Sequence, residues 1–278
     1  MPPAPYDQLY IYEIIGDARP AAQNFGANHL GLWLEGDTSF LFYCAPSDAA
    51  VDAMLAAWPA LSLRERHHLT YDQWQGGMEL HPLVIPGLAV VPAWQQWLAW
   101  PGQAVLRLDP GLVFGNGLHP TTRHCLELLA ALKREGPLGR VLDLGCGSGI
   151  LGLAAAMLGA ESVVCVDLNP LCVETTRRNA ALNELGVEIH EGPAQDHLDR
   201  PANLVLANLH WEVQSGLWRP GPALTGKRDL ILSGLLRSQR GPLVDLLTAA
   251  GFQVLEQREA DQTWFSLWAR RAEEAGQD

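Results

Sequence analysis

The 278-residue sequence has few basic residues for its size and no run of them. It contains 19 Lys and Arg against 31 Asp and Glu, which gives a formal net charge of −12. Such a chain is poorly suited to neutralising a phosphate backbone, so we expect no direct binding to nucleic acid. An acidic surface instead favours encounter with a cationic partner.

The sequence also lacks long apolar runs and paired cysteines. No window reaches the roughly 18 uninterrupted apolar residues of a transmembrane helix, and the N-terminal MPPAPYDQ does not resemble a signal peptide. The five cysteines are odd in number and form no C-x-x-C pair, which argues against zinc or redox sites. We therefore expect buried thiols, no metal site and a cytoplasmic protein without a membrane contact.

Apolar residues, by contrast, are plentiful. Hydrophobic residues make up 48% of the chain and include ten Trp, so ample apolar surface is present to offset chain entropy. The length suits a catalytic domain with a smaller partner. We expect an N-terminal substrate-recognition domain over residues 1–70, a connector over 71–104 and a catalytic domain over 105–278.

The first part of the chain has the pattern of a small α+β domain. Strand-like alternation at residues 9–15, 27–34 and 39–44 precedes helical spacing at 48–58. The connector is rich in Pro, Gly and Trp and has one expected strand at 88–91. Its aromatic side chains either pack between domains or line a substrate groove.

The catalytic part alternates strand and helix, which predicts a parallel sheet covered on both faces. The last two expected strands flank a turn and should be antiparallel. The predicted fold class is therefore α/β, with a Rossmann-like, doubly wound sheet of seven strands. The expected strands cover residues 140–144, 162–167, 187–190, 203–207, 229–233, 252–258 and 263–269.

The strongest local motif is VLDLGCGSGIL, an apolar strand that turns through Gly145, Gly147 and Gly149 into a helix. Glycines let a ligand approach the backbone, and the helix N-terminus offers free N–H donors. Gly147, Gly149 and Gly152 also match a dinucleotide-binding spacing, but that register starts after the strand has ended. The preceding Asp143 suits a cationic amino-acid head better than a pyrophosphate, so S-adenosylmethionine is favoured over a nicotinamide cofactor or a structural turn.

Asp167 ends the second strand, 22 positions after Gly145. This spacing is close to that at which an acid accepts hydrogen bonds from ribose hydroxyls. The alternative is that Asp167 caps a helix, because the sequence Asp167-Leu168-Asn169-Pro170 is also typical of a helix start.

The segment DPGLVFGNGLHPTT, which ends at Thr122, precedes the glycine motif. It is either a plain helix start or a glycine-hinged loop that folds over a bound ligand and excludes water. In the second case Thr122 contacts the methionine end of the ligand. His119, in the same segment, is a candidate catalytic residue.

Asn208 follows the buried strand VLA, where polar residues begin. Ligands of open parallel sheets bind outside the carboxyl ends of the strands. Asn208 is thus a candidate catalytic and cofactor-binding residue that accepts hydrogen bonds from an incoming amine, with a turn-forming Asn as the alternative. His210, Trp211 and Glu212 either shape the substrate side or lie on the surface.

Taken together, DPGLVFGNGLHPTT, VLDLGCGSG, VVCVDLNP and VLANL resemble the bacterial methyltransferases that trimethylate large-subunit ribosomal protein L-eleven. The resemblance covers nearly the whole chain, and LGLWLEGDTSFLFYCAP looks like that family's small ferredoxin-like recognition domain. It implies that Thr122, Gly145, Asp167 and Asn208 contact S-adenosylmethionine. It further implies methylation of lysine side chains and of the terminal amine of a basic ribosomal protein.

Other functions remain open from the sequence alone. A related methyltransferase could act on another protein or on a small molecule. Two alternatives belong to other functional classes, namely a nicotinamide-dependent oxidoreductase and a non-catalytic binding module. We expect a monomer.

Overall fold

The computed structural model describes residues 7–77 and 79–272, which form two compact units. The first unit comprises Met1–Leu80 with Trp94–Gln96, and the second comprises His81–Ala93 with Trp97–Asp278. Within the described residues, no helix combines the length and the hydrophobicity needed to cross a membrane. The five cysteines are free, and all but the exposed Cys44 are buried.

The first unit is a four-stranded antiparallel sheet in the order β2-β3-β1-β4. Its elements follow a β-α-β-β-α-β succession in which a short 3₁₀ helix, η1, takes the place of the first helix. The helix α2 then follows β4 directly. The bounds are β1 (Gln8–Ile15), η1 (Arg19–Asn24), β2 (His29–Glu35), β3 (Thr38–Tyr43), α1 (Asp48–Ala57), β4 (Ser62–Thr70) and α2 (Tyr71–Trp74).

The two faces of this sheet differ because side chains alternate along each strand. Tyr12 and Ile14 of β1 and Leu41 of β3 pack with Val51 and Met54 of α1 into one buried cluster. The neighbouring positions on each strand point to the opposite face, which α1 does not cover.

The expected connector contains more structure than the single strand predicted for it. A three-stranded sheet in the order β5-β6-β7 is formed by β5 (Leu83–Ile85), β6 (Leu88–Pro92) and β7 (Ala104–Leu108). Strands β6 and β7 pair in parallel, and Leu83, Leu88 and Leu106 join the core of the second unit. Because of this packing, the division between the units falls at Leu80 and His81, within the expected connector.

The second unit is built on a seven-stranded sheet in the order β10-β9-β8-β11-β12-β14-β13. The first five strands in that order run parallel, and β13 and β14 form the expected antiparallel hairpin at one edge. The strands are β8 (Arg140–Leu144), β9 (Ser162–Asp167), β10 (Glu188–Glu191), β11 (Leu204–Asn208), β12 (Asp229–Leu236), β13 (Phe252–Ala260) and β14 (Trp264–Arg271).

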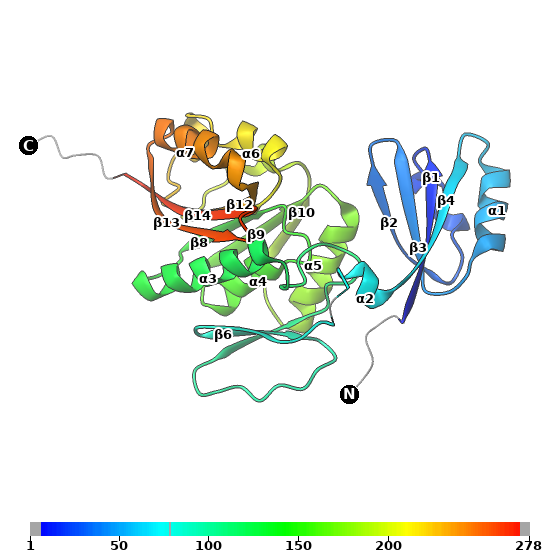
Figure 1. Cartoon of the computed structure of the whole chain (residues 1–278), viewed down its shortest axis with the longest axis horizontal. Coiled ribbons are helices and arrows are strands. Elements are labelled where there is room, and N and C mark those ends of the chain that lie inside the picture. The colour runs from blue at the N-terminus through cyan, green and yellow to red at the C-terminus, as the bar shows by residue number, and fades with distance from the viewer. Residues whose placement is uncertain (1–6, 78, 273–278) are drawn as a thin grey trace, which may run out of the picture. The chain divides into compact units, whose positions relative to one another are not determined.

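Helices cover both faces of the large sheet (Figure 1). On one face α3, α4 and α5 form a common core with the β5-β6-β7 sheet, and on the other α6 and α7 form a second core. The expected α/β fold with a doubly wound sheet is confirmed. The helices are α3 (Pro120–Glu135), α4 (Ile150–Met157), α5 (Pro170–Leu182), α6 (Trp211–Leu217) and α7 (Arg240–Ala249).

Candidate active site

The glycine motif forms a tight loop between β8 and α4. Gly145, Gly147 and Gly149 have φ angles of 72°, 56° and 82°, in the left-handed region that other residues disfavour. A Cβ atom at Gly145 would lie 2.2 Å from Leu209 Cδ2, and one at Gly147 would lie 2.6 Å from the Phe114 carbonyl oxygen. The loop therefore requires glycine for both its conformation and its close contacts.

Asp143 lies beneath this loop and is fully buried. Its Oδ2 accepts a hydrogen bond of 2.8 Å from the Gly152 N–H, while its Oδ1 has no partner among the described residues. Burial raises the pKa of Asp143 to about 7. A Cβ atom at Gly152 would lie 2.5 Å from Cys165 Sγ and 3.0 Å from Asp143 Oδ2. An unpartnered carboxyl oxygen in a dry environment favours a cationic or N–H-bearing ligand group.

Asp167 ends β9 beside the same loop. Its Oδ2 accepts from the Gly147 N–H at 2.9 Å and its Oδ1 accepts from the Asn169 N–H at 2.9 Å. Burial raises the pKa of this carboxyl, and these hydrogen bonds oppose the rise. The helix cap is supplied by Asn169, whose side chain accepts from the Leu171 N–H, so Asp167 itself does not cap α5. Each carboxylate oxygen has a further lone pair for a ligand hydroxyl.

Hydrogen bonds hold the segment before α3 against the glycine loop. Asn179 on α5 accepts from the Asp109 N–H and donates to the carbonyl oxygens of Asp109 and Ser148, each at 2.9 Å. The Ser148 N–H donates to the Phe114 carbonyl at 3.0 Å and its hydroxyl donates to the Gly115 carbonyl at 2.7 Å. These bonds hold the segment against the glycine loop, whereas a freely hinged lid would lack them.

The candidate catalytic residues converge at the end of β11. His119 is the N-cap of α3, and its Nδ1 lies 2.6 Å from Thr121 Oγ1. The Asn208 amide nitrogen donates to the hydroxyls of Thr121 and Thr122, each at 3.3 Å. The helix-start interpretation of this segment therefore holds, and the same residues also meet Asn208 across 86 positions of sequence.

Aromatic rings surround His119. Its ring lies 4.7 Å from that of Trp264 and 5.4 Å from that of Phe114, both in edge-to-face arrangements. Burial lowers the pKa of His119, which keeps the imidazole neutral at pH 7. Half of the Phe114 surface is exposed. A neutral, partly aromatic surface thus adjoins Asn208.

Comparison with known proteins places these features in one family. Residues 67–272 match the family described as ribosomal protein L11 methyltransferase (PrmA). The chain belongs to the ribosomal protein L11 methyltransferase family. A relative of that name from Pelotomaculum thermopropionicum is 37% identical over 227 residues, which cover 80% of this chain and 73% of the relative. Another from an Exiguobacterium species is 36% identical over 66% of this chain and 59% of the relative.

A solved structure agrees with this assignment. The crystal structure of a ribosomal protein L11 methylase from Lactobacillus delbrueckii subsp. bulgaricus has a TM-score of 0.61 and 31% sequence identity. The match covers 69% of this chain and 100% of that one. As a member of the ribosomal protein L11 methyltransferase family, the chain is a methyltransferase with a Rossmann-like sheet.

Several polar residues near the candidate site were not singled out from the sequence. His124 Nδ1 lies 3.1 Å from Ser266 Oγ, which lies 2.6 Å from Ser233 Oγ. Gln214 on α6 donates to the carbonyls of Leu209 and Ser233, which fixes the chain just after Asn208. These residues come from four separate elements, so only the folded structure brings them together.

His210 and Glu212 are exposed at the start of α6, and Trp211 is partly buried there.

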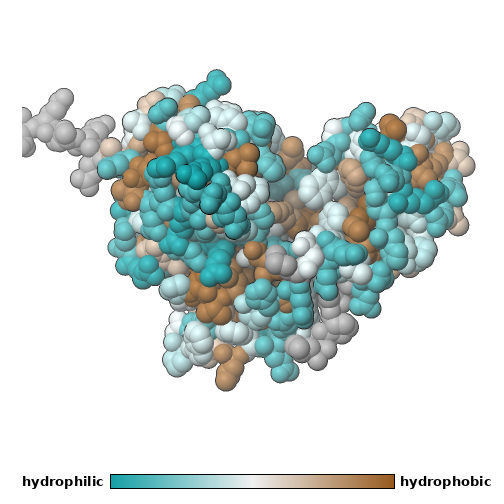
Figure 2. Space-filling view, in the orientation of Figure 1, coloured by the Kyte–Doolittle hydropathy of each residue, from teal (hydrophilic) through white to brown (hydrophobic). Residues whose placement is uncertain are grey.

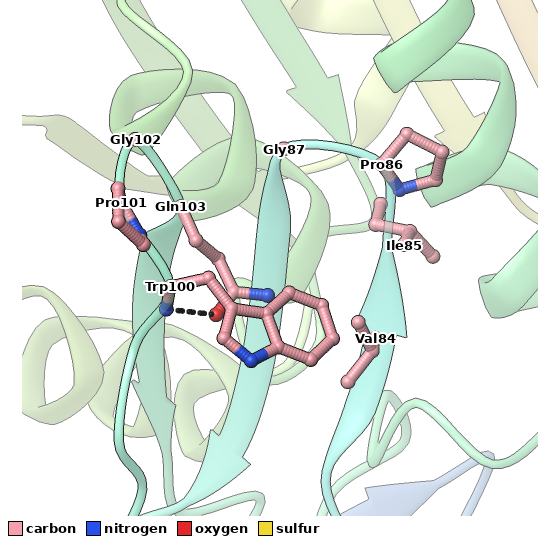
Figure 3. Close-up of a pocket in the computed structure, with 8 residues that line it drawn as sticks. All are labelled: Val84, Ile85, Pro86, Gly87, Trp100, Pro101, Gly102 and Gln103. Atoms are coloured by element: carbon pink, nitrogen blue, oxygen red, sulfur yellow. Dashed lines mark hydrogen bonds between the residues drawn. The ribbon is translucent and has the colours of Figure 1, made fainter.

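A separate hollow of about 400 Å³ lies by the β5–β6 turn, where Trp100 and Pro86 flank it (Figure 3). None of the eight described residues that line it is titratable or belongs to the glycine loop, and we assign it no part in methyl transfer. They are Val84, Ile85, Pro86, Gly87, Trp100, Pro101, Gly102 and Gln103.

Proposed function

We propose that the protein transfers methyl groups from S-adenosylmethionine to amines of a large-subunit ribosomal protein. The observation that carries this proposal is the convergence of the glycine loop, the buried carboxyl group of Asp143, the partly buried one of Asp167, and Asn208 at the carboxyl ends of parallel strands. Ligands of open α/β sheets bind at such an edge.

The residues of the loop fit this cofactor. The unpartnered Oδ1 of Asp143 would accept from the ammonium group of the methionine part, and Asp167 would accept from the ribose hydroxyls. Gly145, Gly147 and Gly149 let the backbone approach the ligand. Thr122 would contact the methionine end. When bound, S-adenosylmethionine supplies a sulfonium methyl group that is already activated.

The protein must then present a neutral amine. A free lysine with a pKa of about 10.4 is neutral in only about one molecule in 2,500 at pH 7, a handicap of about 4.6 kcal/mol. Because the Asn208 amide nitrogen donates to the two threonine hydroxyls, its amide oxygen is the group that would accept from the amine and orient it. Neutral His119, Phe114 and Trp264 would surround the amine without adding charge and would disfavour its ionised form by desolvation.

A basic ribosomal protein fits as the acceptor. The relatives are named for ribosomal protein L11, and a net charge of −12 favours association with a cationic partner. We place the reaction in the cytoplasm, performed by a monomer without direct contact to nucleic acid. The first unit would select the substrate, because the catalytic sheet is shared by many enzymes and specificity needs added surface.

Transfer of label from methyl-tritiated S-adenosylmethionine to purified ribosomal proteins tests this proposal. Labelling of one basic large-subunit protein is the expected result, with loss of labelling in Asp167→Ala. Asp245→Ala, an exposed acid on α7, is the matched control and should keep full labelling. Cofactor binding without labelling of any ribosomal protein would point to another acceptor, and recovery of bound nicotinamide would point to an oxidoreductase.

A further inference from the structure

The face of the first unit's sheet that lies opposite α1 carries a hollow of about 350 Å³. Its lining comes from all four strands and from α2, and it lies opposite the face that packs on α1. Apolar side chains interrupt the polar surface of this unit (Figure 2). The lining residues are Ile11, Trp33, Glu35, Phe40, Phe42, His67, Leu69 and Trp74.

The floor of the hollow is apolar and closely packed. Ile11 and Phe42 are only 4% and 1% exposed. The rings of Phe42 and Trp74 are 5.1 Å apart in an edge-to-face arrangement, and Trp33 and Phe40 complete an aromatic lining. Such a surface offers both apolar contact and aromatic faces that attract cations.

The rim of the hollow is acidic. Glu35 is exposed and lines it directly. His67 also lines the hollow and forms a cluster with Glu13 and Glu65, in which each of the three residues places one polar atom within 4.8 Å of the others. Arg64 pairs with Glu13 at 3.0 Å and balances one of these carboxylates, which leaves an excess of negative charge around the hollow.

An apolar floor with an acidic rim matches one kind of side chain. Lysine has a long apolar stem that can lie on aromatic rings, and its charged end remains beside the carboxylates. A purely apolar side chain would gain nothing from the rim, and a phosphate would be repelled by it.

We propose that this hollow is a second lysine-binding site, which anchors a lysine of the protein substrate other than the one that receives the methyl group. This inference rests on the proposed function, since it takes the substrate to be a basic protein. According to this inference, the sheet face opposite α1 selects the substrate, and it does so by binding a lysine side chain that is not itself methylated.

A matched pair of charge reversals tests the proposal. Glu35→Lys puts a positive charge at the rim, whereas Asp52→Lys makes the same change in net charge on α1, which packs against the opposite face. Both positions are exposed, so long-range attraction of a basic protein weakens equally in the two variants. We expect KM for the ribosomal protein acceptor to rise about tenfold more in Glu35→Lys than in Asp52→Lys. The kcat and the affinity for S-adenosylhomocysteine should stay at the wild-type level in both.

Direct binding separates failure of this inference from failure of the proposed function. Isothermal titration of the full-length protein with a hexalysine peptide should show binding that Asp52→Lys retains and that Glu35→Lys and Trp33→Ala lose. If the wild type labels no ribosomal protein but binds hexalysine in this pattern, the proposed acceptor is wrong and the lysine site stands. Equal KM values, or equal peptide affinities, in the two charge reversals would overturn the lysine site.

Discussion

Replacing Gly147 with alanine should strongly weaken cofactor binding while the protein stays folded. Gly147 has a φ of 56°, and placing a residue with a Cβ in this left-handed region costs about 1–2 kcal/mol. The added Cβ would lie 2.6 Å from the Phe114 carbonyl oxygen, a backbone atom that also accepts from the Ser148 N–H. Relieving that overlap by breaking this hydrogen bond costs a further 0.5–1.5 kcal/mol, roughly.

Together these costs come to about 1.5–3.5 kcal/mol, which corresponds to a loss of about 10- to 400-fold in affinity if the loop must be restored for binding. Gly159→Ala is the matched control, because it has a φ of 82° but its Cβ would meet only Lys133 Nζ, at 3.7 Å. Isothermal titration with S-adenosylhomocysteine gives the affinities, and thermal unfolding shows whether each variant is folded. If the two variants bound equally well, the close approach of the loop to Phe114 would have no bearing on the cofactor.

Four further changes probe other parts of the molecule. Without cofactor, the folded state holds the Asp143 proton up to about pH 7 while the unfolded chain releases it near 3.8, so stability should fall by up to about 4 kcal/mol as pH rises through this window. Urea unfolding at pH 5 and pH 8 should show the part of this loss that falls above pH 5, about 3 kcal/mol, in the wild type and not in Asp143→Asn. Asn208→Ala should lower kcat/KM by about 10- to 100-fold in label transfer with little change in melting temperature, because it removes one aligned acceptor. The kcat of Glu212→Gln should stay within about twofold of the wild-type value. Loss of turnover with unchanged cofactor affinity would show that the carboxylate contacts the amine. A chain that starts at His81 should fold and bind S-adenosylhomocysteine. A chain that starts at Gly102 lacks β5 and β6, so its helical circular dichroism signal should be lost.

The large sheet could be predicted from the sequence because its strands are buried and its helices are periodic. Strand β4 was missed because Arg64, Arg66, His67 and His68 give Ser62–Thr70 a polar composition, which suits an edge strand with one exposed face. Strand β5 has only three residues, too few for a period to show.

The residues of the candidate site also differ in whether the sequence predicts them. Asp143 and Asp167 follow from their positions at strand ends, since neighbouring parallel strands place those ends together. Trp264 and Ser266 could not be predicted, because they lie on the antiparallel strand β14 and meet α3 only through the order of strands in the sheet. Sequence spacing carries no information about that order.

The contact between Gly152 and Asp143 affects how such sequences are classified. Gly152 completes a dinucleotide-like glycine spacing, yet here it leaves room for a buried carboxyl and for Cys165 Sγ. A pattern search that counts glycines alone would therefore group this chain with nicotinamide enzymes, and one that adds the aspartate four residues before Gly147 would separate them. Replacement of Gly152 by a larger residue should accordingly be accepted only together with a smaller residue at position 165 or 143, and libraries that vary all three positions should yield replacements of Gly152 that single changes do not.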